Sequence, residues 1–172
     1  MIKDSTRLVT PKNSVVTYSG NVIDLFKPDP TLILLEDIAH GLSNICRWNG
    51  ATKSFYSVAE HSVAVARHVS LGEQLAALFH DAEEAYWGDI TRPVKAMLPS
   101  KVIEAILNFR QVIFDKYGIL PITEQINEAD DKEIMWDYEN LIKANKWEGW
   151  KPKEAKQRWL EAVNFYLKTA KL

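Results

Sequence analysis

The stretch LFHDAEEAYWGDI, residues 78–90, combines helical spacing of apolar residues with a dense set of ionisable side chains. At about 100° per residue, one arc collects the apolar side chains of this segment, which are Leu75, Leu78, Phe79, Ala82 and Tyr86. His80, Asp81 and Glu84 fall on the opposite arc, with His80 and Glu84 one helical turn apart. Such a polar arc is either a solvated helix surface or half of a metal site.

The residues around the polar arc favour the metal site. Ala77 and Ala85 border the arc, and side chains this small would let another element of the fold approach it. The segment then runs into Gly88-Asp89, which brings a further carboxylate toward the same cluster.

Composition and charge exclude several classes of protein. The 172 residues are 47% hydrophobic and 26% charged, typical of one globular domain spanning residues 1–172. A net charge of −2 gives no electrostatic case for a nucleic-acid or membrane partner. Cys46 is the single cysteine, so intramolecular disulfides and cysteine-rich zinc sites are excluded. Residues 1–5 lack the apolar run of a signal peptide, and no apolar stretch reaches the roughly 20 residues of a membrane span, which predicts a cytoplasmic protein.

The periodicity of the chain predicts a mainly α fold with a short N-terminal β-hairpin. Alternating residues around the turn Ser19-Gly20-Asn21 indicate the hairpin within residues 14–26. Helical spacing follows over residues 32–45, 57–69, 72–86, 100–117, 121–145 and 153–169. Proline and glycine residues separate these segments, at Gly88, Pro93, Pro99, 118–121 and 147–152.

A metal site on the polar arc needs ligands from elsewhere in the chain. Hydrolytic divalent ions favour mixed imidazole and carboxylate ligands, and the remaining histidines are His40, His61 and His68. His61 lies at the edge of the apolar stripe of its predicted helix, where an inward ligand should be. His68 lies about 10 Å further along that helix, too far to share the ion. His40 precedes a glycine, and we interpret it as a packing or capping residue.

Glu60, next to His61, has a structural explanation. Ser57 and Glu60 match the S-x-x-E capping box, in which each side chain bonds the other residue's backbone N–H. We therefore assign Glu60 no part in the chemistry.

The fourth ligand is expected within EQINEADDKEIMWDY, residues 124–138. The helical wheel does not settle which carboxylate faces inward. Asp130 is central if Ile134 marks the core, whereas counting Met135 as core favours Asp131.

These residues resemble the H…HD…D signature of the HD-domain metal-dependent phosphohydrolases. His61 stands alone, His80-Asp81 form the pair, and Ala129-Asp130 follow on a later helix. The strings RWNG (47–50), YSVAEHS (56–62) and HDAEEAYWGDITRPVK (80–95) resemble the branch that contains bacterial 5′-deoxynucleotidases and phage dATP triphosphohydrolases. The similarity spans roughly residues 15–145, and its most specific part lies between Arg47 and Lys95.

The resemblance implies a role for each matching residue within a single HD-domain helical bundle. The implied metal ligands are His61, His80, Asp81 and Asp130, with the Ala-Asp pattern selecting Asp130 over Asp131. Glu84 would position or deprotonate the attacking water, and Asp89 would transfer a proton near the leaving oxygen. The implied substrate contacts are Arg47 and Trp48, for phosphate and for sugar or base, and Lys95, for phosphate. The implied cofactor is a divalent transition metal, Zn, Co, Mn or Fe, with a second divalent cation accompanying a triphosphate.

The implied reaction is hydrolysis of dATP to deoxyadenosine and triphosphate by a homo-oligomer, in the host cytoplasm if the protein is phage-encoded. One alternative is a 5′-deoxynucleotidase acting on deoxynucleoside monophosphates, and another is a non-catalytic nucleotide-sensing HD module. A cyclic-dinucleotide phosphodiesterase would carry a Gly-Tyr-Pro element and further histidines, which this chain lacks. Gly50, beside the expected base pocket, offers no steric basis for rejecting a purine 2-amino group.

Overall fold

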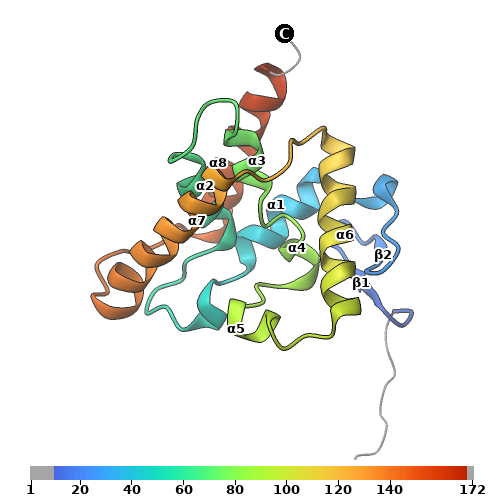
Figure 1. Ribbon diagram of the computed structural model, residues 1–172, viewed down its shortest axis with the longest axis horizontal. Coiled ribbons are helices and arrows are strands. Elements are labelled where there is room, and N and C mark those ends of the chain that lie inside the picture. Colours follow the sequence, from blue (N-terminus) through green and yellow to red (C-terminus); the bar gives the residue numbers. More distant parts are fainter. Residues whose placement is uncertain (1–9, 170–172) are drawn as a thin grey trace, which may run out of the picture.

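The computed structural model describes residues 10–169, and they form a mainly α-helical arrangement with a β-hairpin at the N-terminal side (Figure 1). Strands β1 (Ser14–Val16) and β2 (Val22–Asp24) pair antiparallel, with Val15 opposite Ile23. Gly20 occupies the turn with a φ of 87°, a backbone conformation that glycine adopts without a steric penalty. The predicted hairpin and the mainly α class are confirmed.

The helices follow the hairpin in chain order. The α-helices are α1 (Leu35–Asn44), α2 (Val58–Ala66), α3 (Gln74–Phe79), α4 (Glu84–Trp87), α5 (Arg92–Lys95), α6 (Ser100–Tyr117), α7 (Glu124–Asp137) and α8 (Pro152–Thr169). Short 3₁₀ turns form η1 (Pro30–Leu32) and η2 (Trp48–Gly50), and a π-helical turn forms η3 (Tyr138–Lys143).

Local chemistry explains several helix ends. The Ser57 hydroxyl accepts a hydrogen bond from the Glu60 N–H at the start of α2, and Thr123 does the same for Ile126 at the start of α7. Gly118 ends α6 in the left-handed conformation, with a φ of 64°.

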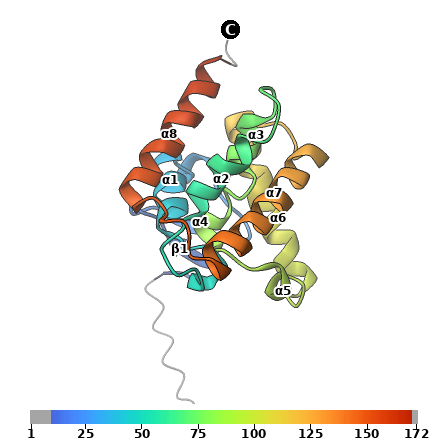
Figure 2. The same cartoon turned by 90° about the vertical axis from the view of Figure 1, so that its left-hand side faces the viewer.

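Helix α2 lies at the centre of the helical arrangement. It packs against α1, α3, α7 and α8, and Figure 2 shows α8 on one side of it and α7 on the other. The buried Trp159 of α8 donates from its indole N–H to the Leu78 carbonyl of α3, at 3.0 Å. His61 of α2 is thereby placed deep in the molecule, between α3 and α7.

The helix predicted over residues 72–86 is interrupted, which corrects the helical-wheel picture. Helix α3 ends at Phe79 and α4 begins at Glu84, with a tight turn between them. The His80 Nδ1 lies 2.7 Å from the Ala77 carbonyl, the acceptor that an α-helix reserves for the Asp81 N–H. The side chain therefore competes with the helix at this point. The apolar arc is nevertheless confirmed in most of its residues, because Leu78, Phe79, Ala82 and Tyr86 are buried and Leu75 is partly buried against the core.

Two other predicted boundaries also differ from the structure. The segment 121–145 divides into α7 and the π-helical η3, and residues 92–95, predicted as a break around Pro93, form the short helix α5. Proline fits the first turn of a helix, where its missing N–H would have no partner.

The Glu60 side chain has a different structural role from the one predicted. Its carboxylate accepts hydrogen bonds from the Trp147 indole N–H, at 3.0 Å, and from the Trp150 backbone N–H, at 2.7 Å. Only the Ser57 half of the capping box is therefore confirmed. Glu60 holds the segment before α8 against α2, where a Cβ on Gly149 would lie 2.1 Å from the Phe55 carbonyl oxygen.

None of the helices within residues 10–169 has the length and apolar character needed to cross a bilayer. Residues 1–5, on which the expected lack of a signal peptide rests, lie outside the described residues.

Candidate metal centre

Three residues from separate elements meet at the inner end of a pocket. His61 of α2, His80 after α3 and Asp130 of α7 each offer a ligand atom within 4.8 Å of the others. The Asp130 Oδ1 lies 3.0 Å from the His61 Nε2 and 3.9 Å from the His80 Nε2. All three belong to the ligand set implied by the resemblance, and together they could hold a metal ion.

Asp81, the fourth implied ligand, stands beside this group rather than within it. Its Oδ2 lies 3.0 Å from the His80 Nε2 and 3.9 Å from a terminal nitrogen of Arg47. A modest side-chain rearrangement would be needed for all four residues to bind one ion.

The histidine ring at position 80 supports a bound cation. Its Nδ1 contacts the Ala77 carbonyl, and a hydrogen on Nδ1 leaves the Nε2 of a neutral ring with a lone pair. This Nε2 is buried without a hydrogen-bond partner among the described residues, and it faces the carboxylates of Asp81 and Asp130. A lone pair facing two carboxylates is unfavourable unless a proton or a metal ion lies between them.

The charges around the two histidines differ. Complete burial, together with the charge of Arg47, lowers the pKa of His61 to about 4, so the ring is neutral at pH 7 and available as a ligand. Burial alone would also lower the pKa of His80, but the carboxylates of Asp81 and Asp130 raise it overall. Burial opposes ionisation of Asp130, yet its contacts with His61 and His80 lower its pKa.

The structure separates the two aspartates that the helical wheel left unresolved. The Asp130 side chain is 20% exposed and faces His61, whereas the Asp131 side chain is 63% exposed and pairs with Arg92. Met135, which would favour Asp131 if it were counted as core, is 60% exposed on the outer side of α7.

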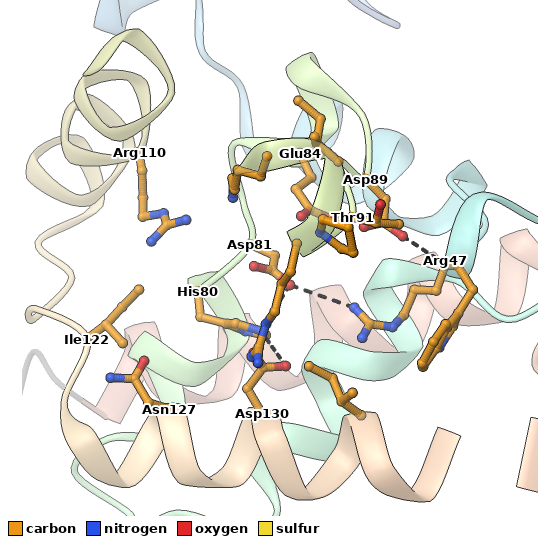
Figure 3. A pocket seen from close by; sticks show the side chains of 16 residues that line it. Arg47, His80, Asp81, Glu84, Asp89, Thr91, Arg110, Ile122, Asn127 and Asp130 are labelled. Carbon is orange, nitrogen blue, oxygen red and sulfur yellow. Dashed lines mark hydrogen bonds and ion pairs between the residues drawn. The ribbon is translucent and has the colours of Figure 1, made fainter. Parts of the chain in front are cut away.

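A pocket of about 440 Å³ opens beside the metal group (Figure 3). In Figure 3, His80, Asp81 and Asp130 converge, with Arg47 on one side and Arg110 on the other. The pocket is lined by eight of the nine implied site residues, Arg47, Trp48, His80, Asp81, Glu84, Asp89, Lys95 and Asp130, while His61 lies in the metal group itself. Ile90, Pro93, Ile122 and Ile134 add apolar surface.

Two acidic residues of the pocket, Glu84 and Asp89, have raised pKa values. Burial, strengthened by the charges of Asp81 and Asp89, raises the pKa of Glu84 well above its usual value. Burial also raises the pKa of Asp89, and Arg47 partly opposes this. Glu84 is 7% exposed, and its Oε2 has no hydrogen-bond partner among the described residues. The solvated-surface interpretation of the polar arc is therefore wrong.

The loop that carries Arg47 and Trp48 has an unusual backbone. Trp48, Asn49 and Gly50 have φ values of 58°, 50° and 75°, all in the left-handed region. That region is disfavoured for a bulky residue such as tryptophan and is found mainly where surrounding contacts enforce it. The Asp89 carboxylate accepts the Trp48 backbone N–H at 3.1 Å, which is one such contact.

Sequence reasoning missed three charged residues around the pocket. Arg110 of α6 and Arg92 of α5 line it, and Asp137, at the end of α7, accepts hydrogen bonds from Arg47 and Trp48. A signal for two of them was present in the sequence. Arg110 stands at helical spacing from the buried Ile106 and Ile113, and Asp137 stands eleven residues, or three turns, after Ile126.

The other two histidines lie outside the metal group. His40 stacks on Tyr18 with ring centroids 3.9 Å apart, which confirms its interpretation as a packed residue. His68 follows the end of α2, contacts Glu133 at 2.6 Å and does not join His61, as its distance along the predicted helix 57–69 indicated.

The comparisons with known proteins identify relatives of this chain. The chain is 40% identical over 137 residues to the uncharacterized protein RCAP_rcc00048 of Rhodobacter capsulatus, across 72% of this chain and 70% of the relative. It is 41% identical over 109 residues to the uncharacterized protein YfdR of Escherichia coli K12, across 63% of this chain and 60% of YfdR. No model of a known protein family matches the chain. The chain belongs to the same family as RCAP_rcc00048.

Proposed function

We propose that this member of the family is a metal-dependent phosphohydrolase that cleaves the 5′ phosphoester of deoxynucleotides, with dATP as the first candidate substrate. The observation that carries the proposal is the group of the buried His61 and His80 with the partly buried Asp130, which adjoins a pocket lined by both acids and cations. The sequence resemblance to HD-domain phosphohydrolases supports the same assignment.

The donor atoms suit a divalent transition metal. His61, His80 and Asp130 would hold it, with Asp81 as the adjacent fourth ligand. Two imidazoles and two carboxylates are ligands that zinc, cobalt, manganese and iron accept. Such an ion would lower the pKa of a water molecule and polarise a phosphate oxygen.

Two carboxyl groups in the pocket can move the protons of the reaction. Glu84 is a strong base once ionised, because burial raises its pKa, and it can orient a water molecule and accept its proton. Asp89, whose pKa burial also raises, can hold a proton and deliver it to the leaving O5′ atom. In this step, the water oxygen forms a bond to the α-phosphorus and the P–O5′ bond breaks.

The cations of the pocket support a triphosphate substrate. Arg47, Arg92, Lys95 and Arg110 all line it, more positive charge than one phosphate requires. Three of these cations already have acidic partners, however. Arg47 pairs with Asp137 through its Nε, and one of its terminal nitrogens lies 3.9 Å from the Asp81 Oδ2. Arg92 pairs with Asp130 and Asp131, and Arg110 pairs with the buried Glu83. The pairs of Arg92 and Arg110 favour the alternative, a 5′-deoxynucleotidase that needs only Arg47 and Lys95 for one phosphate.

The decisive experiment is a substrate screen. The protein is incubated with each dNTP, each dNMP and ATP together with Co²⁺, Mn²⁺ or Zn²⁺, and the products are separated by chromatography. We expect dATP to yield deoxyadenosine and triphosphate. We also expect dATP to react at least about 10-fold faster than ATP, a difference of about 1.4 kcal/mol. The reason is that a ribose 2′-hydroxyl against the Trp48 ring would lose hydration without gaining a partner.

Each other outcome has a defined meaning. Release of orthophosphate with dADP would place the attack at the γ-phosphorus and contradict the proposal. Cleavage of dAMP alone would favour the 5′-deoxynucleotidase. Binding of a deoxynucleotide without turnover under any metal would favour a nucleotide sensor.

A further inference from the structure

We propose that Asp137 is a positioning residue that aligns the substrate-binding pair Arg47-Trp48 with the metal ligand His61. This inference rests on the proposed function for the roles of those three residues. It stands on the contacts made by one buried carboxylate.

Asp137 stands where three parts of the site meet. Its side chain is fully buried at the end of α7, next to the point where the helix widens into the π-helical η3. One oxygen, Oδ2, accepts hydrogen bonds from the Arg47 Nε at 3.1 Å and from the Trp48 Nε1 at 3.3 Å. The same oxygen lies 3.9 Å from the His61 Nδ1.

The Arg47-Trp48 loop needs such an anchor. Its backbone is left-handed at three successive residues, two of which are not glycine. A conformation of this kind persists only where contacts outside the loop hold it. Asp89 fixes the Trp48 backbone, whereas Asp137 fixes the Trp48 indole and the Arg47 guanidinium. Because Asp137 engages the Nε of Arg47, the terminal nitrogens point toward the metal side of the pocket, where one of them lies 3.9 Å from the Asp81 Oδ2.

The link to His61 follows from two buried atoms without partners. The His61 Nδ1 and the Asp137 Oδ1 are both buried, and neither has a hydrogen-bond partner among the described residues. A histidine that binds metal through one ring nitrogen almost always donates from the other to a carboxylate, carbonyl or water. With the His61 Nε2 directed at the metal group, the carboxylate that faces Nδ1 is that of Asp137, whose Oδ2 lies 3.9 Å away. A small approach of the two groups would bring Nδ1 within hydrogen-bond range of this carboxylate.

The first test measures binding without turnover. Asp137→Asn keeps the shape of the side chain but replaces one acceptor oxygen with an NH₂ group. By calorimetry, we expect it to weaken tripolyphosphate binding to the metal-free protein at least about 10-fold. We also expect it to weaken Co²⁺ binding about 10- to 100-fold. Glu139→Gln, two residues further on and exposed, is the matched control and should change neither.

A double-variant cycle separates positioning from general destabilisation. If Asp137 acts through Arg47, then Asp137→Asn should weaken tripolyphosphate binding no further in an Arg47→Ala background. Additive losses would contradict this role. A folded Asp137→Asn protein that binds both tripolyphosphate and Co²⁺ within twofold of wild type would overturn the proposal.

A second measurement uses the wild-type protein, so it does not depend on whether an Asp137 variant folds. In the zinc-loaded wild-type protein with ¹⁵N-labelled histidine, NMR should find a hydrogen on Nδ1 of His61 that exchanges slowly with solvent. A His61 ring without a hydrogen on Nδ1, or with one that exchanges at the rate of an exposed imidazole, would overturn the link to Asp137.

Failure of the proposed function would look different. A wild-type protein that binds tripolyphosphate and Co²⁺ but hydrolyses no nucleotide would remove the phosphohydrolase assignment and leave the role of Asp137 testable by the same binding losses. If the wild-type protein hydrolyses dATP and Asp137→Asn retains wild-type binding, the phosphohydrolase assignment stands and the role of Asp137 is removed. Wild-type protein that binds neither ion would overturn the proposal.

Discussion

Asp130 and Asp131 are adjacent carboxylates in very different surroundings. Asp130 contacts His61 at 3.0 Å inside the metal group, whereas Asp131 faces solvent and Arg92. We expect Asp130→Asn to abolish stoichiometric binding of Co²⁺ or Zn²⁺, because it removes a charged ligand, and Asp131→Asn to retain it. Elemental analysis of the purified, metal-loaded variants measures this. Stoichiometric metal in Asp130→Asn, or its loss only in Asp131→Asn, would contradict the assigned ligand.

Glu84 separates the chemistry of the site from its metal. Glu84→Gln should retain the fold and the bound ion, because Glu84 lies outside the group of ligand atoms, yet lose most of its turnover without a base. Steady-state kinetics on metal-loaded protein measure the loss. An active variant would show that the water needs no side-chain base.

The same variant predicts a pH dependence of stability in the metal-free protein. The pKa of Glu84 is raised in the folded state, so folding is favoured while the group is protonated. This stability is fully present below the unfolded pKa of about 4.3 and is lost as pH rises through the folded pKa. At pH 8, we therefore expect metal-free Glu84→Gln to be more stable than wild type and to melt at a higher Tm. Circular dichroism melts in EDTA should show the difference disappearing by about pH 4.

Among the secondary-structure elements, α1 and α4 make an unusually close contact. A Cβ on Gly41 of α1 would lie 2.8 Å from the Cβ of Ala85 in α4. Ala85 therefore lets another helix approach closely, as its small side chain predicted. Gly41→Ala should force the two helices apart and lower the free energy of unfolding by about 1–3 kcal/mol. Gly72→Ala is the control, because a Cβ there would meet nothing within 4 Å. Equal Tm values for the two variants would contradict this account.

Glu60 joins the segment before α8 to α2. Its two hydrogen bonds come from donors on residues 147 and 150, and a glutamine in its place would turn an NH₂ group toward one of them. We expect Glu60→Gln to lower the free energy of unfolding by about 1 kcal/mol, because one of these part-buried donors loses its acceptor. Urea unfolding measures this change, with Glu139→Gln as the control because Glu139 forms an exposed ion pair with Lys143. A change below about 0.5 kcal/mol would mean that these bonds contribute little.

For the molecule as a whole, a bound metal should act as a link between distant segments. His61, His80 and Asp130 come from α2, the turn after α3, and α7, and the unfolded chain does not hold them together. An ion at 100 times its Kd should stabilise the fold by about 2.7 kcal/mol, roughly 5–10 °C in Tm for a domain of this size. Differential scanning fluorimetry with Co²⁺ and then EDTA tests this. His61→Ala should show no such shift, and an equal shift in that variant would place the ion elsewhere.

Local pattern was sufficient for much of the fold. The hairpin, the bounds of α6 and the buried arc of Leu78, Phe79, Ala82 and Tyr86 follow from periodicity and turn residues. These features depend on neighbours within about one or two turns, which is the range that a sequence pattern reports. The sequence also indicated which histidines belong to the metal group, because the chain has only four of them.

Tertiary structure alone decided how the polar residues are paired. Asp137 lies 90 positions from Arg47, and Glu60 lies 87 positions from Trp147, so no local period relates them. The helical wheel left the choice between Asp130 and Asp131 open, because it could not tell whether Met135, which is 60% exposed, belongs to the core. The resemblance to the HD-domain proteins selected Asp130, and the packing of α7 against α2 gives the physical reason. A helical wheel ranks apolar side chains by angle alone. Burial is determined by the elements that pack against each face, and those elements come from distant parts of the chain.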